Sequence, residues 1–402
     1  MVKGKRFTGT VEGWVTVIRR KLSAGELGSL PVVLVLAAIW IVFQSLNPNF
    51  LSPRNLSNLS VDIVGTGLIA VGIVFVLLLG ELDLSVGSIS GLAAAVFAVL
   101  NVNSGVPEWL ALVVAVLAGT VAGTVQGYSF ARTRVPAFVV TLAGLLTWNG
   151  LMLSILGTSG TVNLDENGLV AELTSYYFTS DAVAYAVAAV GAGLVFLVAY
   201  QDRRRRQAVG MPHRSLGSIA TRTGVVAVIA FAAAYVLNRF QGLPLALLIF
   251  LMMVAGLDLL LRRTHYGRQV YALGGGVEAA RRASLSVTRV QTAVLAISGT
   301  MAAIGGLFLA SRITSVSQSS GSGVLLLNAI AAAVIGGTSL FGGRGTTWSA
   351  VLGMLVIQSI ASGMAITDTP AAVQFMITGG VLFAAVVIDS LSRRSQEAHG
   401  RA

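Results

Sequence analysis

The chain has 402 residues, of which 55% are hydrophobic and only 11% are charged, and its net charge is +11. Soluble domains carry about a quarter charged residues, so this composition is typical of a membrane protein. The absence of cysteine excludes disulfides, thiolate nucleophiles and cysteine metal ligands. The last lysine is Lys21, so the chain has no P-loop lysine with which to bind ATP itself.

Hydropathy predicts twelve membrane-spanning helices, each of which needs about 20 mostly apolar residues. In chain order they are 30–46, 61–80, 84–101, 107–128, 136–157, 181–200, 223–238, 243–261, 290–310, 324–338, 347–364 and 372–390. No small-residue cleavage site follows the first apolar run, which therefore indicates a retained span and not a signal peptide. The predicted fold class is an all-α polytopic membrane protein.

The basic residues predict the orientation of these spans. All but three of the 27 basic residues are arginines, and they cluster in short segments between apolar runs. This pattern is that of the positive-inside rule, and it argues against a nucleic-acid partner. With a cytoplasmic N-terminus, only Arg54, Arg239 and Arg312 lie outside. Both termini are therefore predicted to be cytoplasmic.

The same segments divide the chain into regions. A basic cytoplasmic segment (1–29) precedes a transmembrane domain (30–392), and a cytoplasmic tail (393–402) follows it. Within the domain, 201–222 is a basic cytoplasmic loop and 262–289 is a second cytoplasmic segment. For the loop, orientation and attraction to anionic lipid are favoured over protein docking.

Two spans adjoin turns that are broken by glycine, "LGELDLSVGSISG" (79–91) and "IGGTSLFGGRGT" (335–346). Glycine-interrupted apolar segments in corresponding halves of a chain indicate a translocation site. The candidate residues of a translocation path are polar side chains in or near these turns and in the neighbouring spans: Glu81, Asp83, Ser85, Ser88, Asn149, Asn328, Thr338 and Ser339.

Alternative interpretations exist for these polar residues. An acid at membrane depth is costly and usually functional. Asp83, however, precedes Ser85 at the start of a span, where capping or packing of the helix is the favoured role. Several in-membrane side chains could hydrogen-bond a sugar, although such groups more often join helices. They are Gln126, Trp148, Asn149 and Gln358.

No catalytic or metal-binding constellation is expected. His213, His265 and His399 fall in separate cytoplasmic segments without an acid at ligand spacing. No G-x-S-x-G nucleophile elbow is present. The sequence therefore predicts a protein that is not an enzyme and holds no metal or cofactor of its own.

The segment "GGGVEAARRASL" (274–285) concentrates charge in a chain that has little. The glycines at 274–276 are predicted to let the chain turn sharply. Glu278 then opens a short helix at its positive end, and Arg281 and Arg282 follow toward the negative end.

Helical spacing assigns two faces to this short helix. Ala279, Ala280, Ala283 and Val287 are predicted to pack on the membrane helices. Leu285 is predicted to be an apolar knob within a charged rim, which suits docking into a partner. The alternative is an ordinary solvated helix with arginines that set orientation.

Four motifs resemble those of one known family. They are "GELDLSVGSISGLAAAV", "RTRVPAFVVTLAGLLTWNGL", "YGRQVYALGGGVEAARRASLSVTRVQ" and "LNAIAAAVIGGTSLFGGRGT". The chain resembles, over residues 30–392, the permease subunits of bacterial ATP-binding-cassette importers for monosaccharides (ribose, galactose and xylose). Its length, its basic loop and the "NRFQGLPLALL" stretch are most similar to the xylose type.

The resemblance implies a fold, a place and partners. The fold would be that of the vitamin B12-type importers, enlarged by a pair of helices, in the bacterial cytoplasmic membrane. The partners would be a second copy of the chain, a cytoplasmic ATPase that binds ATP and Mg²⁺, and an extracytoplasmic sugar-binding protein. Family members often carry Asp where this chain has Asn328, so a charge-based role there does not carry over.

In this family the charged segment is the coupling helix, which contacts the ATPase. The residues that the resemblance implies for this contact are Gly275, Gly276, Glu278, Ala279, Ala280, Arg281, Arg282 and Leu285. The main alternative function is an ion-coupled secondary sugar transporter, which needs paired ionisable residues at the membrane midplane. An intramembrane enzyme is a weaker third alternative.

Overall fold

A computed structural model describes residues 30–133 and 135–398. The predicted segment 1–29 and the last four residues of the predicted tail lie outside the described residues. The described helices, in chain order, are α2 (Leu30–Leu46), α3 (Pro53–Leu78), α4 (Val86–Ala98), α5 (Glu108–Thr133), α6 (Ala137–Leu156), α7 (Leu169–Ser175), α8 (Asp181–Ala208), α9 (Leu216–Asn238), α10 (Leu245–Arg263), α11 (His265–Gly275), α12 (Val277–Arg282), α13 (Val287–Ile313), α14 (Gly323–Ile335), α15 (Thr347–Ile366) and α16 (Ala371–Ala398).

Each of the twelve predicted spans overlaps one of these helices. Nine described helices are long and apolar enough to cross a membrane, and three shorter apolar helices lie at Leu30–Leu46, Gly323–Ile335 and Ala371–Ala384. α4 continues into a π-helical turn, Val99–Asn103, which brings its span to 18 residues. The protein is therefore an all-α polytopic membrane protein.

Several helices extend well beyond the apolar ranges that predicted them, and α3 and α8 show why. α3 begins at Pro53 because the Ser52 hydroxyl accepts a hydrogen bond from the backbone N–H of Asn55 (3.3 Å) and because proline suits the first turn. α8 continues to Ala208 through four arginines, which are good helix formers. The predicted basic loop 201–222 is thus mostly helical, and only a short link before α9 is not.

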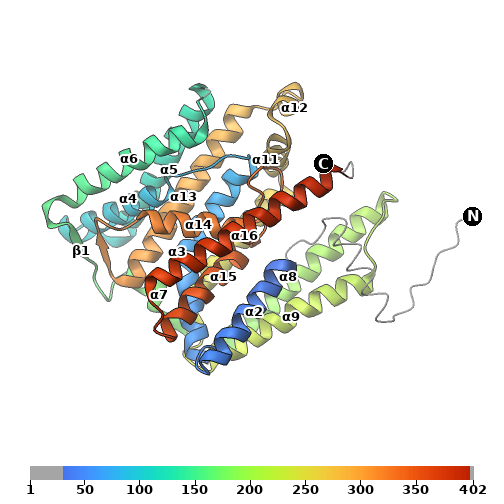
Figure 1. Ribbon diagram of the computed structural model, residues 1–402, viewed down its shortest axis with the longest axis horizontal. Helices are drawn as coiled ribbons and strands as arrows, with labels where there is room; N and C mark the ends of the chain where they lie inside the picture. Colours follow the sequence, from blue (N-terminus) through green and yellow to red (C-terminus); the bar gives the residue numbers. More distant parts are fainter. Residues whose placement is uncertain (1–29, 134, 399–402) are drawn as a thin grey trace, which may run out of the picture.

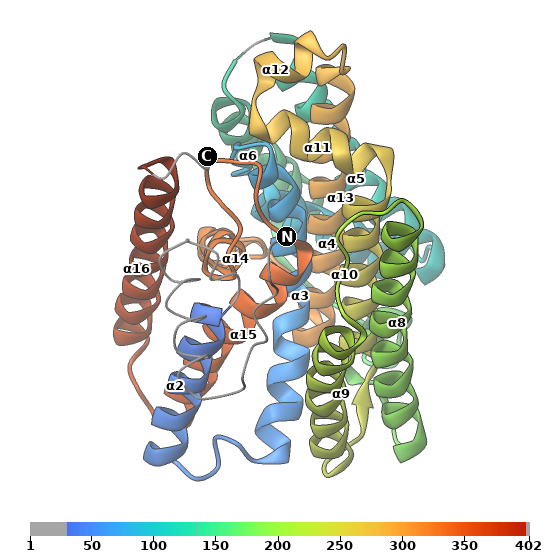
Figure 2. The same ribbon diagram turned by 90° about the vertical axis from the view of Figure 1, so that its right-hand side faces the viewer.

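α13 is a central helix of the bundle and packs against α3, α4 and α5 (Figure 2). Gly119, Gly123 and Gly127 recur every four residues along the face of α5 that meets α13. A Cβ atom at Gly123 would collide with the carbonyl oxygen of Leu295 on α13. Glycine therefore lets these helices approach closely, which matters in lipid because burial of apolar side chains gives little driving force there.

α8 and α9 form a pair at one edge of the bundle, and α2 and α16 lie at the other edge (Figure 2). The pair packs through a small apolar cluster near its outer end: Ala184, Ala188, Ala234, Leu237 and Leu243. The remaining faces of α8 and α9 are mostly exposed and apolar, as expected for helices that face lipid.

Four short strands join the segments that are predicted to lie outside the cell. They are β1 (Thr161–Asn163), β2 (Tyr177–Phe178), β3 (Leu243–Pro244) and β4 (Ser315–Ser317). β1 pairs with β4 and β2 pairs with β3, both antiparallel. Figure 1 shows β1 and α7 at the end of the bundle opposite α12. The segment between α6 and α8 is thus tied to two other outside segments.

Replacing Gly123 with leucine should destabilise the bundle, because the new side chain would enter backbone space on α13. Overpacking of this kind costs about 1–3 kcal/mol or more. Gly191 on α8 is the matched control, since a Cβ there meets nothing within 4 Å. In detergent, Gly123→Leu should melt well below the parent protein and Gly191→Leu should melt close to it. Equal melting temperatures for the two variants would contradict the close packing of α5 on α13.

Candidate functional site

The two glycine-broken turns contact each other although more than 250 residues separate them in the chain. The backbone N–H of Gly343, in the turn between α14 and α15, donates to the carbonyl oxygen of Leu78 at the end of α3 (2.9 Å). Gly80 and Gly342 adopt left-handed conformations (φ +77° and +84°) and lie against each other. The sequence predicted both turns but not their contact.

Asp83 is the centre of a buried hydrogen-bond cluster in the turn between α3 and α4. Its carboxylate, 1% exposed, accepts from the backbone N–H of Ser85 (3.0 Å) and from the Ser85 hydroxyl (2.6 Å). Its second oxygen accepts from the hydroxyl of Ser298 on α13 (2.9 Å). A buried carboxylate is tolerated when its oxygens are satisfied in this way. These contacts are those of a residue that packs and joins helices.

Gln126 on α5 extends the cluster. Its Oε1 lies 2.8 Å from the Ser85 hydroxyl, whose single proton is also within reach of Asp83, while its buried Nε2 has no partner. The Ser85 proton and the Gln126 Nε2 each find a partner when the Gln126 side-chain amide is flipped, which exchanges its oxygen and nitrogen. Nε2 then donates to the Ser85 hydroxyl, and the Ser85 hydroxyl donates to Asp83. The buried Nε1 of Trp148, also without a partner, lies beside Gly144, as does the Gln126 amide.

α6 holds the same turn from a third side. The Thr141 hydroxyl accepts from the backbone N–H of Leu84 (3.1 Å) and lies 3.3 Å from the carbonyl oxygen of Leu82. Burial raises the pKa of the Glu81 carboxyl, and a hydrogen bond from the backbone N–H of Ala137 opposes this shift. The turn is therefore fixed to α5, α6 and α13 together.

The other predicted path residues are distributed less closely. Thr338 and Ser339 lie buried in the second turn, where the backbone N–H of Ser339 donates to the carbonyl oxygen of Arg344 (2.9 Å). Ser88 is buried on α4. Asn149 on α6 and Asn328 on α14 are half-buried and lie outside both turns, as does Gln358 on α15. The structure thus joins the two turns but does not gather all eight candidates.

The charged segment begins differently from the prediction. Gly274 and Gly275 belong to α11, and only Gly276 separates α11 from α12. A Cβ on Gly274 would collide with the carbonyl oxygen of Leu78 and would lie 2.8 Å from the nitrogen of Gly343. The prediction that all three glycines form a sharp turn is therefore wrong, because Gly274 serves close packing within a helix.

The faces of α12 also differ from the prediction. Ala280 is buried as expected, but Ala279 and Ala283 are exposed. The helix is only six residues long, and the left-handed Ser284 (φ 58°) turns the chain back, so helical spacing does not continue to Val287. Leu285 is half-buried against the core and is not an exposed knob.

The exposed surface of α12 consists of Val277, Glu278, Ala279, Arg281 and Arg282. Glu278 and Arg281 form an exposed ion pair (3.2 Å), which by itself stabilises the helix by only about 0–1 kcal/mol. Figure 2 shows α12 at one end of the molecule, where it is available to a partner.

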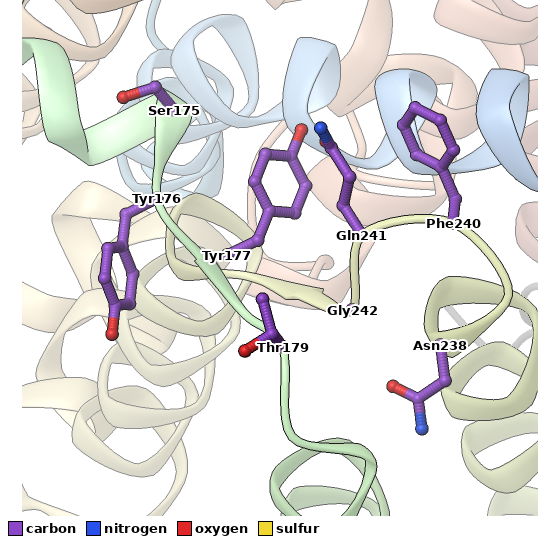
Figure 3. A pocket seen from close by; sticks show the side chains of 8 residues that line it. All are labelled: Ser175, Tyr176, Tyr177, Thr179, Asn238, Phe240, Gln241 and Gly242. Carbon is purple, nitrogen blue, oxygen red and sulfur yellow. The ribbon is translucent and has the colours of Figure 1, made fainter.

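A hollow of about 480 Å³ lies between the segment after α7 and the segment after α9 (Figure 3). Among the lining side chains, Tyr177, Gln241 and Phe240 point upward in this view, while Tyr176 and Asn238 point downward. The sequence analysis did not identify it. Aromatic side chains at this level are typical of the membrane interface.

Ionisable side chains outside these places form few clusters. Within the described ranges, His, Asp and Glu form no group of three that could hold a metal ion. The sequence analysis did not predict the contacts that Tyr271, Gly274 and Ser298 make with distant residues, which are Gly345, Leu78 and Asp83 respectively.

Comparison with known proteins gives consistent matches. The family model described as branched-chain amino acid transport system / permease component matches residues 55–386. The xylose transport system permease protein XylH of Escherichia coli K12 is 38% identical over 347 residues, which cover 86% of this chain and 87% of that protein.

Two further relatives extend the comparison. XylH of Haemophilus influenzae is 36% identical over 90% of this chain and 96% of its own length. The ribose import permease protein RbsC of Bacillus subtilis is 30% identical over 91% of this chain and 94% of its own length. No solved structure matches the chain significantly.

Replacing Asp83 with leucine should lower the stability of the protein, because the buried Ser85 and Ser298 hydroxyls would lose their acceptor. A buried polar group left without a partner costs about 1–3 kcal/mol. Asp62→Asn is the control, since Asp62 forms a partly exposed ion pair with Arg312, a type worth about 0–1 kcal/mol. Thermal unfolding in detergent measures both, and similar melting temperatures would show that the Asp83 cluster does not hold the helices together.

Proposed function

We propose that this chain, which belongs to the branched-chain amino acid transport system / permease component family, carries D-xylose or a similar pentose or hexose into the bacterial cell. It is a permease subunit of the ribose/xylose type from a sugar ATP-binding-cassette importer. It is a multi-pass protein of the cytoplasmic membrane and a transport subunit, not an enzyme.

Similarity to relatives of known substrate supports xylose as the cargo. The relatives named for xylose are 36–38% identical, and the ribose relative from Bacillus subtilis is 30% identical, each over most of both chains. The matches cover 86–91% of this chain, which supports the same architecture here. We infer the vitamin B12-importer type of fold, with α8 and α9 as the added pair of helices.

The partners follow from what this chain lacks and what it exposes. A P-loop needs a lysine to reach the phosphates of ATP, and the last lysine of this chain, Lys21, precedes the first described helix. ATP and Mg²⁺ are therefore held by a separate ATPase subunit. The exposed charged surface of α12 supports docking of that ATPase. An extracytoplasmic binding protein delivers the sugar at the opposite end, and a second copy of the chain completes the translocation path.

An ion-coupled secondary transporter is the alternative, and the acidic residues do not favour it. Such a transporter needs an ionisable group free to bind and release the coupling ion. Asp83 instead accepts three hydrogen bonds, and Asp62 is paired with Arg312.

Energy coupling distinguishes the two functions. Sugar uptake should stop when cellular ATP is depleted while the proton gradient is maintained, because the ATPase drives the cycle. Radiolabelled xylose uptake in cells that express the complete importer measures this. A collapsed gradient with normal ATP should leave uptake intact, and uptake that follows the gradient instead would overturn the proposal.

Reversing a charge on α12 should break ATPase docking. Glu278→Arg places a third cation beside Arg281 and Arg282, and a like-charge contact in an interface lowers affinity by about ten-fold or more. The matched control is Asp202→Arg, which reverses the charge of the acid in another exposed cytoplasmic ion pair, the one with Arg206 on α8 (3.3 Å).

The measurement is co-purification of the ATPase with the tagged permease. Glu278→Arg should lose the ATPase and sugar uptake, while Asp202→Arg should keep both. Retention of the ATPase by Glu278→Arg would rule out α12 as its docking surface.

A further inference from the structure

α11 directly precedes α12 in the chain, and its C-terminal half contacts both glycine-broken turns. It begins where the Thr264 hydroxyl accepts from the backbone N–H of Gly267 (3.1 Å). Gly267, Val270 and Leu273 form its buried face. Figure 2 shows α11 between α12 and the rest of the bundle.

Three contacts connect the C-terminal half of α11 to both turns. Gly274 lies directly on the carbonyl oxygen of Leu78, which precedes the first turn. Gly274 also lies beside Gly343 in the second turn. The Tyr271 hydroxyl donates to the carbonyl oxygen of Gly345, in the same turn (2.8 Å). We call this group, together with the bond between Gly343 and Leu78, the glycine junction.

Apart from the Tyr271 hydroxyl, the junction is made of backbone atoms that contact each other with no side chain between them. A Cβ at Gly274 has no room, and Gly343 and Gly345 adopt φ angles of +72° and +151°, which other residues rarely adopt. At Gly274, a displacement of α11 therefore cannot be absorbed by a change of side-chain rotamer. Burial raises the pKa of Tyr271, which further favours the protonated hydroxyl that donates the hydrogen bond to Gly345.

Beyond the junction, each turn adjoins a short, largely buried helix, α4 or α14. The first turn carries Asp83, which binds the start of α4 through Ser85 and binds α13 through Ser298. The second turn joins the end of α14 to α15. The start of α4 also touches the segment before α14, since a Cβ on Gly87 would lie 2.7 Å from the carbonyl oxygen of Gly321. The start of α4 is thus connected to both ends of α14, through the glycine junction to its C-terminal end and through Gly87 to the segment before its N-terminal end.

We propose that Tyr271 is a positioning residue for transport, whose hydrogen bond to Gly345 makes the second turn move together with α11. The contact of Gly274 with Leu78 moves the first turn with the same helix. A displacement of α12 by the ATPase then reaches both broken turns at once. This inference rests on the proposed function, because it requires an ATPase at α12.

The test variant is Tyr271→Phe, which removes one hydroxyl and keeps the ring. The matched control is Tyr266→Phe on the same helix, because the buried Tyr266 hydroxyl has no hydrogen-bond partner. Each variant is purified as the complete importer and reconstituted in liposomes with the binding protein and xylose. ATPase association, ATP hydrolysis and sugar transported per ATP are measured for each.

The Tyr271→Phe complex should retain the ATPase and hydrolyse ATP. It should transport at least about five-fold less sugar per ATP hydrolysed, a factor at the lower end of typical allosteric couplings. Tyr266→Phe should match the parent complex. A Tyr271→Phe complex with the parent ratio, or one that loses the ATPase, would overturn the inference. Failure of the parent permease itself to bind an ATPase would instead overturn the proposed function.

Discussion

Direct contact between backbones, made possible by glycine, is the constraint on which the rest of this structure depends. In lipid, apolar side chains gain little from leaving their surroundings, so helices are held by close packing and by hydrogen bonds. α5 reaches α13 through Gly123, and α11 reaches α3 through Gly274. Because neither contact leaves room for a methyl group, the positions of these helices are defined by the backbone itself.

The same constraint places the polar cluster. α5 must lie close to α13 for Gln126 and Ser298 to reach the one turn that carries Asp83 and Ser85. Buried polar groups are costly without partners, and here the partners come from helices that glycine has brought near. Close packing and polar satisfaction therefore support each other, and the cluster fixes the start of α4.

Apolar length was readable from the sequence, since each predicted span overlaps a helix. Helix ends that are set by capping were harder to predict from hydropathy. α3 shows this, because it begins after the Ser52 cap with Pro53 and a polar first turn that apolar length does not reveal. Contacts between distant residues were not readable. The sequence around Asp83 does not indicate that Ser298 contacts it. Three consecutive glycines suggest a turn, and only the structure shows that the carbonyl oxygen of Leu78 lies against Gly274.

The prediction of the two faces of α12 was wrong for a related reason. Helical periodicity assigns faces only while the helix continues, and α12 ends at Arg282. The positive φ of Ser284 then directs Leu285 back toward the core. The prediction from the charge pattern is confirmed, with an acid in the first turn of α12 and two arginines in its last turn. This prediction requires only that a short helix is present, and not that it continues to Val287.

The ladder between β2 and β3 has a consequence for how α8 and α9 belong to the chain. Tyr177 pairs with Pro244, so the two ends of the excursion that contains both helices lie side by side. Near that outer end the pair packs on Leu243 of β3 and on Leu247 and Leu248 of α10. α8 and α9 therefore have the geometry of an insertion into a shorter ancestor, since the flanking segments could be rejoined by a tight turn without moving α7 or α10.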